Sequence, residues 1–272
     1  MINKKRLINT FLELVQIDSP SGEEEAMAIE MTKRLKKLGA HVERDSYGNV
    51  IAKFSGRLGV EPLMLNAHLD TVEPGRGIKP IIKSIKSTKG TKSIRCITSN
   101  GTTILGGDDR AGLAVIIEAL TAVKESGVPH ISLEIVLTLG EEVGLFGAKN
   151  LDYSLIAAKT GISFDGHSGV DNVTTAAPGL FTVDATITGR SAHAGAEPEK
   201  GISAIVIASK IISRLKLGRI DEETTANVGL VEGGSARNVV PETVTTRGEI
   251  RSRNKAKIDK HIAHFKKVFQ DV

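Results

Sequence analysis

The sequence predicts an α/β domain with a largely parallel central sheet, followed by a smaller α+β domain. Two patterns predict this order. Apolar runs typical of buried strands alternate with amphipathic helices as far as Asp165, and strictly alternating strands with covering helices follow the loop Thr174–Gly179. The 272 residues are 40% hydrophobic, which is enough for a packed core. We therefore predict domains 1–176 and 177–272, with the boundary near Ala176.

Two helices should open the first domain. The apolar stripe of residues 7–15 predicts the first helix. Ser21 and Glu24 resemble a capping box that would start the second helix, and Gly39 is well placed to end it. The strands and the third helix that should follow are Val42–Arg44, Asn49–Phe54, Leu63–Asn66, Ala111–Lys124 (the helix), Leu133–Leu139 and Gly161–Phe164.

The second domain should contain half-solvated strands. Residues 181–187 alternate between apolar and polar or small side chains, and further strands are expected near Asn227–Val231 and Val244–Ile250. A helix rich in Ile and Ala runs from about Gly201 to Leu217, and residues 258–269 carry apolar side chains on one helical side. Strands that face water on one side and helices on the other are typical of a small α+β domain.

The composition argues against some classes of binding partner. The formal net charge is +4, basic and acidic residues are interspersed, and aromatic residues are only 3%, which argues against a nucleic-acid surface. The single cysteine, Cys96, cannot form an internal disulfide. No apolar run is long enough to span a bilayer, and the N-terminus lacks an unbroken signal-peptide core. We expect a cytoplasmic protein that binds neither nucleic acid nor membrane.

His68 and Asp70 follow the apolar strand Leu63–Asn66. Two residues apart on an extended segment, their side chains leave the same face, so the carboxylate can hold the imidazole. Such a pair fixes the ring tautomer for metal binding. The alternative is a lone histidine with a solvated aspartate at a strand end.

Asp108 and Asp109 lie where the chain turns into the helix Ala111–Lys124. Aspartate is a common N-cap, and capping explains one of the two. A carboxylate that bridges two metal ions must present both oxygens to them and cannot also cap a helix. We therefore interpret Asp108 as the bridge and Asp109 as its support.

Glu141 and Glu142 follow the strand Leu133–Leu139, and Asp165 follows Gly161–Phe164. Open α/β sheets place their sites at the carboxyl ends of strands. One glutamate can bind a metal while repulsion keeps the other poised as a base, although a surface Glu pair is usually only solvated. One imidazole with several carboxylates suits a divalent ion such as zinc, and a metal pair needs one bridging carboxylate.

Four motifs together resemble the co-catalytic zinc exopeptidases, a family that includes carboxypeptidase G2 and aminoacylase 1. The resemblance is strongest to the peptidase T branch, whose members are tripeptide aminopeptidases. The motifs are His68-Leu-Asp70-Thr-Val, Gly106-Gly-Asp108-Asp109-Arg-Ala-Gly, Gly140-Glu141-Glu142-Val-Gly and Phe164-Asp165-Gly.

The resemblance implies a zinc-exopeptidase catalytic domain, with a mainly parallel sheet and helices on both faces. It also implies two zinc ions per subunit, although cobalt and manganese suit the same ligands. His68, Asp108 and Asp165 would hold one ion, and Asp108 and Glu142 the other. Glu141 would be the general base toward a metal-bridged water that attacks a short peptide, and Asp70 would orient His68.

Residues 177–272 resemble the lid domain of the family, which also makes the contact between subunits. A homodimer is therefore expected. The resemblance places His193 near the oxyanion, and Asn238 and Arg251 where relatives bind the substrate backbone or carboxylate. Arginine suits a carboxylate through its bidentate fork, but Arg251 also fits a charged strand end on a solvated face.

One departure keeps alternatives open. Relatives supply a further histidine ligand from a segment that returns to the catalytic domain after the lid, and no such histidine precedes Val272. We expect a sequence truncated at its C-terminus, which leaves the activity of the chain itself open. An amidase or deacylase of N-acyl amino acids, or a non-catalytic metal-binding dimerisation module, are the other hypotheses. Glu141 favours an enzyme, because a structural metal site needs no unliganded base.

Overall fold

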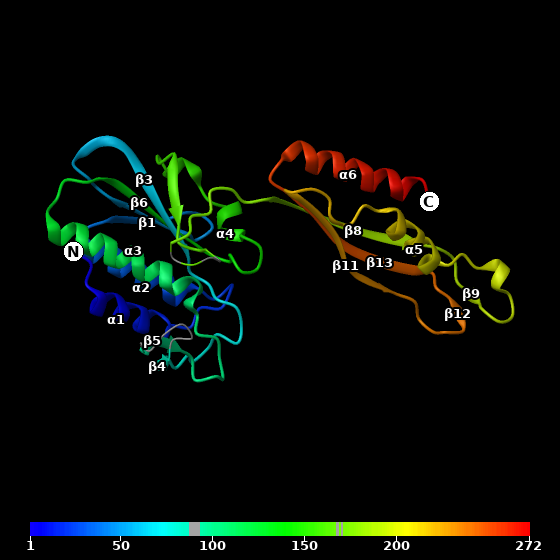
Figure 1. The fold of residues 1–272 in the computed structure, drawn as a ribbon, viewed down its shortest axis with the longest axis horizontal. Helices are drawn as coiled ribbons and strands as arrows, with labels where there is room; N and C mark the ends of the chain where they lie inside the picture. Colours follow the sequence, from blue (N-terminus) through cyan, green and yellow to red (C-terminus); the bar gives the residue numbers. More distant parts are fainter. Residues whose placement is uncertain (87–92, 167–168, 170) are drawn as a thin grey trace. The chain divides into compact units, whose positions relative to one another are not determined.

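The computed structural model describes residues 1–86, 93–166, 169 and 171–272. They form two compact units, Met1–Asp171 and Asn172–Val272, which are described separately (Figure 1). Among the described residues, none of the helices combines the length and the apolar character needed to cross a membrane.

The first unit is built on a five-stranded mixed sheet. Strand β3 runs parallel to both of its neighbours, β6 and β7, whereas β1 and β2 at the other edge are antiparallel, since a short turn joins them. Strand β2 is also antiparallel to the middle strand, β6. The parallel half agrees with the sequence prediction, and the antiparallel edge departs from it. In spatial order the strands are β1 (His41–Arg44), β2 (Val50–Phe54), β6 (Ile131–Thr138), β3 (Leu58–His68) and β7 (Thr160–Ser163).

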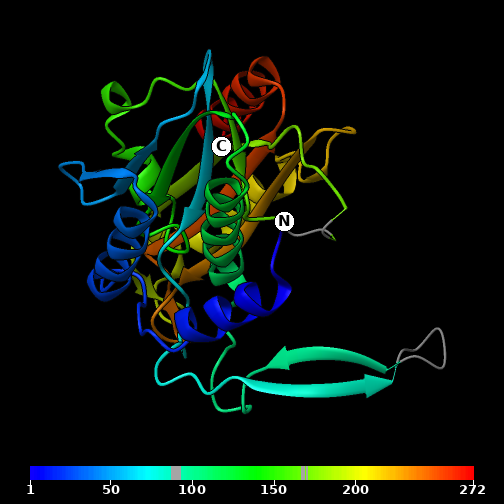
Figure 2. The same cartoon turned by 90° about the vertical axis from the view of Figure 1, so that its left-hand side faces the viewer.

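Three long helices share one hydrophobic core with one face of this sheet (Figure 2). Alternate strand residues such as Ala52, Leu65 and Ile135 point into that core. The helices are α1 (Lys4–Leu14), α2 (Glu25–Leu38) and α3 (Gly107–Ser126).

Shorter elements complete the first unit. On the sheet face opposite the long helices, the Glu134 carboxylate accepts hydrogen bonds from the backbone N–H groups of Ala157 and Ala158. These residues follow the short helices α4 (Phe146–Lys149) and η1 (Tyr153–Leu155). A separate antiparallel hairpin, β4 (Ile81–Lys86) and β5 (Ser93–Thr98), projects from the unit (Figure 2).

The predicted capping box of α2 is wrong. The helix begins at Glu25, and the side chains of Ser21 and Glu24 bond instead to Asp70 and to the backbone of Gly140. The predicted end is confirmed, because Gly39 is the C-cap and adopts the left-handed conformation with φ 99°.

The second unit is an antiparallel sheet with two helices on one face. Ile187, Val244 and Ile250 face the helices, and the intervening residues of these strands are mostly polar. This agrees with the half-solvated strands predicted from the sequence. In spatial order the strands are β10 (Gly218–Arg219), β11 (Thr224–Gly233), β13 (Thr243–Ser252) and β8 (Gly179–Thr188), and the helices are α5 (Ala204–Arg214) and α6 (Lys255–Gln270). A small second sheet pairs β9 (Ala192–His193) with β12 (Val239–Val240), and η2 (Pro198–Lys200) follows β9.

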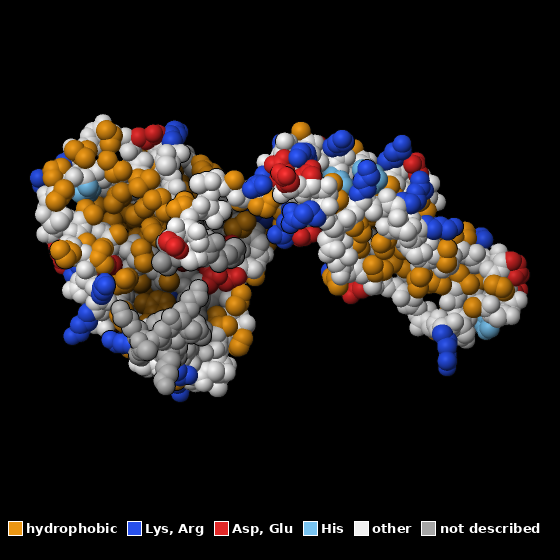
Figure 3. Space-filling model, viewed as in Figure 1, with side chains coloured by type: hydrophobic (Ala, Val, Ile, Leu, Met, Phe, Trp, Pro, Cys, Tyr) orange, Lys and Arg blue, Asp and Glu red, His pale blue; other side chains and the backbone are white. Residues whose placement is uncertain are grey.

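Two histidines of α6 hold the backbone of Lys216. The Nε2 atom of His261 lies 2.9 Å from the Lys216 carbonyl, and Nε2 of His264 accepts a hydrogen bond from the Lys216 N–H at 3.2 Å. Partial burial lowers the pKa of His264, and the charges of His261, Lys216 and Lys267 act in the same direction. Figure 3 shows Lys and Arg side chains over this helix. The neutral form of His264 is therefore the one that the fold selects.

Acidification should release Lys216. Because the folded-state pKa of His264 lies below its ordinary value of about 6.5, its stabilising effect is complete above that pH and is lost as the pH falls through the folded-state pKa. We expect the protection of the Lys216 amide against hydrogen exchange to fall as the pH is lowered below about 6.5. The variant His264→Gln keeps an acceptor that does not titrate, so its protection should change less. Equal pH dependence in both proteins would contradict this role.

Candidate metal centre

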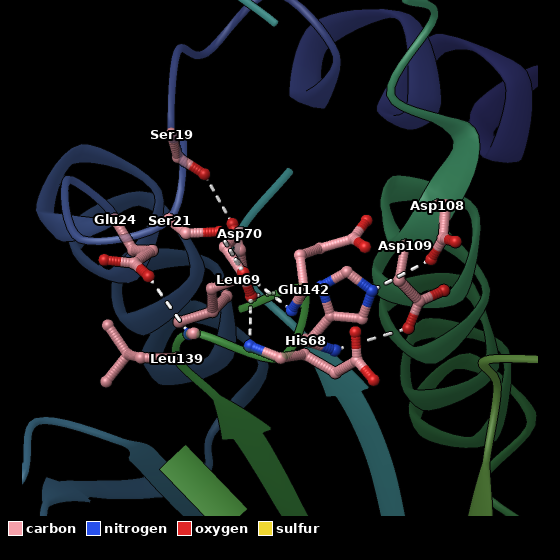
Figure 4. Close-up of polar contacts among 12 residues, drawn as sticks. Ser19, Ser21, Glu24, His68, Leu69, Asp70, Asp108, Asp109, Leu139 and Glu142 are labelled. Atoms are coloured by element: carbon pink, nitrogen blue, oxygen red, sulfur yellow. Dashed lines mark hydrogen bonds and ion pairs between the residues drawn. The ribbon is translucent and has the colours of Figure 1, made fainter. Parts of the chain in front are cut away.

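His68 stands at the end of β3 and is buried between two carboxylates (Figure 4). Its Nδ1 atom lies 3.2 Å from Oδ1 of Asp70, and its Nε2 atom lies 2.9 Å from Oδ1 of Asp108. Burial opposes a charged imidazole, but the hydrogen bonds to Asp70 and Asp108 outweigh it and raise the pKa of His68 to about 9. Since Asp70 holds Nδ1, the nitrogen that can bind a cation is Nε2.

Asp108 and Asp109 have separate partners. Both have non-helical backbone angles, and the peptide bond between them is cis. Asp109 is buried, and its carboxylate accepts hydrogen bonds from the N–H groups of Gly112 and His68, at 3.1 and 3.3 Å. Burial raises the pKa of Asp109 to about 7. Asp109 thus joins the start of α3 to β3, whereas the more exposed Asp108 faces His68 and is suited to a ligand role.

The segment Leu139–Glu142 follows β6 and is called the catalytic loop below, after the role that the resemblance implies for Glu141. Asp70 accepts the N–H of Glu141 on Oδ1 at 2.9 Å and the N–H of Glu142 on Oδ2 at 3.1 Å. Ser21 donates its hydroxyl to Oδ2 of the same carboxylate at 2.7 Å. Burial opposes the charge of Asp70, but these bonds and the one to His68 outweigh it and lower its pKa to about 2. One ionised carboxylate therefore orients the imidazole and fixes the backbone of the loop.

The carboxyl groups of Glu141 and Glu142 stand in an acidic environment. Burial is the main cause that raises the pKa of each. The charge of Asp165 adds to the effect at Glu141, and that of Asp108 adds to it at Glu142. Partly buried carboxylates that repel one another favour either a proton or a cation among them.

The structure brings together every site residue predicted in the first unit. One group of potential ligand atoms within 4.8 Å of one another comes from His68, Asp108 and Glu142. A second group, from His68, Glu141 and Asp165, contains Glu141 where the resemblance implies Asp108. A donor set of one imidazole nitrogen and several carboxylate oxygens fits divalent ions of the zinc type. The site lies at the carboxyl ends of β3, β6 and β7, which are parallel neighbours.

The predicted residues of the second unit fall in two places. His193 in β9 pairs with Val239, so Asn238 lies beside it, and the Asn238 carbonyl accepts the N–H of Ala194. Nδ1 of His193 accepts the backbone N–H groups of Gly195 and Ala196. Arg251 lies in the four-stranded sheet, paired with Leu180 of β8, and its guanidinium makes two hydrogen bonds to Glu249, at 2.8 and 3.0 Å. This arrangement favours the interpretation of Arg251 as a charged residue on a solvated strand over its interpretation as a binding site for a substrate carboxylate.

Sequence reasoning missed the supports beneath the site. The buried Arg110 donates to the Leu69 carbonyl at 2.9 Å and to the Ser19 hydroxyl at 2.7 Å, and the Ser19 hydroxyl also donates to the Leu69 carbonyl. Burial lowers the pKa of Arg110 to about 10. These bonds tie Ser19, just before Ser21 and Glu24, to the segment that follows His68. In the sequence the only sign of this segment is the Ser21 and Glu24 pattern, which is typical of a helix cap.

Both units match known protein families. Residues 49–169 match the model described as peptidase family M28, and residues 175–272 match the peptidase dimerisation domain of the M20 group. Carboxypeptidase G2 of Pseudomonas is 31% identical over 260 residues, which cover 90% of this chain and 59% of that protein.

Two solved structures are more similar. A tripeptidase from Staphylococcus aureus shares 41% identity with a TM-score of 0.90, covering 99% of this chain and 72% of that one. An aminopeptidase PepT from Bacillus cereus shares 44% identity with a TM-score of 0.91, covering 98% of this chain and 72% of that one. Identity at this level over most of both chains, together with the dimerisation domain, shows that the chain belongs to the peptidase T-like branch of the M20 peptidases.

Proposed function

We propose that the protein is a metal-dependent aminopeptidase that removes the N-terminal residue from short peptides, tripeptides above all. The observation that carries this proposal is that potential ligand atoms of His68 lie close to those of Asp108 and Glu142 in one group and to those of Glu141 and Asp165 in a second, at the carboxyl ends of three parallel strands. It is supported by 41–44% identity to a tripeptidase and to an aminopeptidase PepT.

The proposed cofactor is a pair of zinc ions. His68, Asp108 and Asp165 would hold one ion, and Asp108 with Glu142 the other, so that Asp108 would be shared. When bound, the two ions would lower the pKa of a water molecule and polarise the scissile carbonyl. Mixed imidazole and carboxylate donors support this assignment.

Glu141 is the proposed general base. Burial and the nearby carboxylates raise its pKa, which brings it closer to the value that a base needs near neutral pH. It would take a proton from the attacking water as the oxygen bonds to the carbonyl carbon. It would then give that proton to the amide nitrogen as the C–N bond breaks, which releases an amino acid and a dipeptide. Asp70 would keep the loop that carries Glu141 in place.

The second unit would act as a lid and dimer contact, in keeping with its match to a peptidase dimerisation domain. Because Nδ1 of His193 accepts two backbone N–H groups, Nε2 is the atom that would donate a hydrogen bond to the oxyanion. Asn238 beside it would bind the substrate backbone, and Arg251 is the weaker candidate since Glu249 occupies its guanidinium. A cytoplasmic location is part of the proposal.

Blocking the substrate amine tests the proposal. The zinc-loaded protein should release the first residue of a tripeptide with a free N-terminus and should leave its N-acetylated form intact, as measured by mass spectrometry of the products. Treatment with a chelator is the control and should stop the reaction. Hydrolysis of N-acetyl amino acids instead would favour the deacylase hypothesis. Zinc binding without hydrolysis of either substrate would favour the non-catalytic module.

A further inference from the structure

Three consecutive glutamates at the start of α2 have different surroundings. The side chains of Glu23 and Glu25 are 62% and 64% exposed and form ion pairs with Arg76 and Arg44 on the surface. Glu24 between them is only 5% exposed. Glutamate is rarely buried without strong partners, so the position of Glu24 needs a specific explanation.

The partners of Glu24 are backbone amides of two separate segments. Its Oε1 atom accepts the N–H of Gly22 at 2.9 Å and the N–H of Gly140 at 3.1 Å. Figure 4 labels Glu24 and Leu139, the residue before Gly140. Gly140 lies 116 residues further along the chain and directly precedes Glu141. It adopts a left-handed conformation with φ 59°, at the point where the catalytic loop leaves β6.

The same short segment reaches the loop by a second route. Ser21 donates to Asp70, and Asp70 accepts the next two amides of the loop, those of Glu141 and Glu142. Three successive loop amides are therefore held by two buried carboxylates. Glu24 holds the first directly, and Asp70 holds the other two.

We propose that Glu24 is a positioning residue, which fixes the backbone of Gly140 and so aims the carboxylates of Glu141 and Glu142 at the metal centre. The inference rests on the proposed function for the roles of these two carboxylates, but not for the contact itself. A carboxylate acceptor is suited to this task because bonds to an ionised group are about twice as strong as neutral ones. Glu24 needs no contact with substrate or metal to act in this way.

Two substitutions with side chains of similar length distinguish the hydrogen-bond acceptor of Glu24 from the packing of its side chain. Glu24→Gln keeps an oxygen that can accept the Gly140 N–H, whereas Glu24→Met fills the same space without an acceptor. We expect Glu24→Met to weaken zinc affinity by about tenfold or more, the usual effect of losing a group that orients ligands. It should lower kcat by a similar factor with little change in KM, and Glu24→Gln should restore most of both. The flanking variants Glu23→Gln and Glu25→Gln are matched controls and should behave as the unmodified protein.

Hydrogen exchange makes the test independent of activity and of the folding of the variants. In the unmodified protein the Gly140 amide should be protected, and its protection should fall most in Glu24→Met, less in Glu24→Gln and not at all in either flanking variant. Fast exchange of Gly140 in the unmodified protein would overturn the proposal. So would zinc affinity in Glu24→Met equal to that of Glu24→Gln. The unmodified protein could bind zinc without cleaving tripeptides, while the variants still change zinc affinity and Gly140 protection as expected. In that case the proposed function fails and the role of Glu24 stands.

Discussion

Replacing Glu141 with glutamine is expected to lower kcat for tripeptide hydrolysis by about 10²–10⁴-fold while zinc stays bound. Glutamine has nearly the shape of glutamate but cannot take up a proton from water. The backbone N–H of residue 141 would still donate to Asp70, so the loop should keep its path. Steady-state kinetics and the zinc content of the purified protein measure the two effects.

The neighbouring residue supplies the control for this experiment. Glu142→Gln carries the same chemical change one position along the chain, with its N–H held by the same carboxylate. As a proposed ligand, it should weaken zinc binding as well as catalysis. Unchanged hydrolysis by Glu141→Gln would remove this residue from the role of general base. Equal loss of zinc in both variants would make Glu141 a ligand, in line with its place in the second donor group.

Replacing Asp70 with alanine is expected to affect both metal binding and folding. The change leaves three donors without their acceptor, namely the hydroxyl of Ser21 and the amides of Glu141 and Glu142, and it removes the carboxylate that faces Nδ1 of His68. Zinc affinity should fall by about 10–100-fold, because the imidazole and the loop lose their orientation. Each buried donor that stays unpaired should cost about 1–3 kcal/mol in the free energy of unfolding. Zinc titration against a competing chelator and urea unfolding measure the two quantities.

Ser21→Ala serves as the comparison for Asp70, since it removes only one of these bonds. It should cost about 1 kcal/mol in the free energy of unfolding and leave zinc affinity much closer to that of the unmodified protein. If Asp70→Ala had no greater effect than Ser21→Ala, the carboxylate would not be the centre of the network.

The candidate site could be predicted because its residues directly follow apolar strands, a pattern that is visible in short stretches of sequence. His68, Glu141 and Asp165 each follow an apolar run, and the carboxyl ends of neighbouring parallel strands lie at one edge of the sheet. The direction of a strand is less visible in the sequence. Residues 50–54 are almost all buried and resemble a parallel strand, yet β2 pairs antiparallel with both neighbours.

The supporting contacts could not be predicted, because they depend on distant partners. Ser21 and Glu24 match a capping box by spacing, and only the tertiary position of Asp70 and Gly140 decides that they bond elsewhere. Arg251 is the opposite case. Glu249 is two residues away on the same face of β13, so the sequence already contained the partner that occupies its guanidinium.

The catalytic loop is held through its backbone, so its conformation does not depend on the side chains that it carries. Two carboxylates hold three consecutive amides, and amides are present whichever side chains occupy positions 141 and 142. The side chains at positions 141 and 142 can therefore be exchanged while the backbone that carries them keeps its path. This property makes the loop a starting point for redesign, in which a new donor at position 142 would alter metal preference without a new backbone.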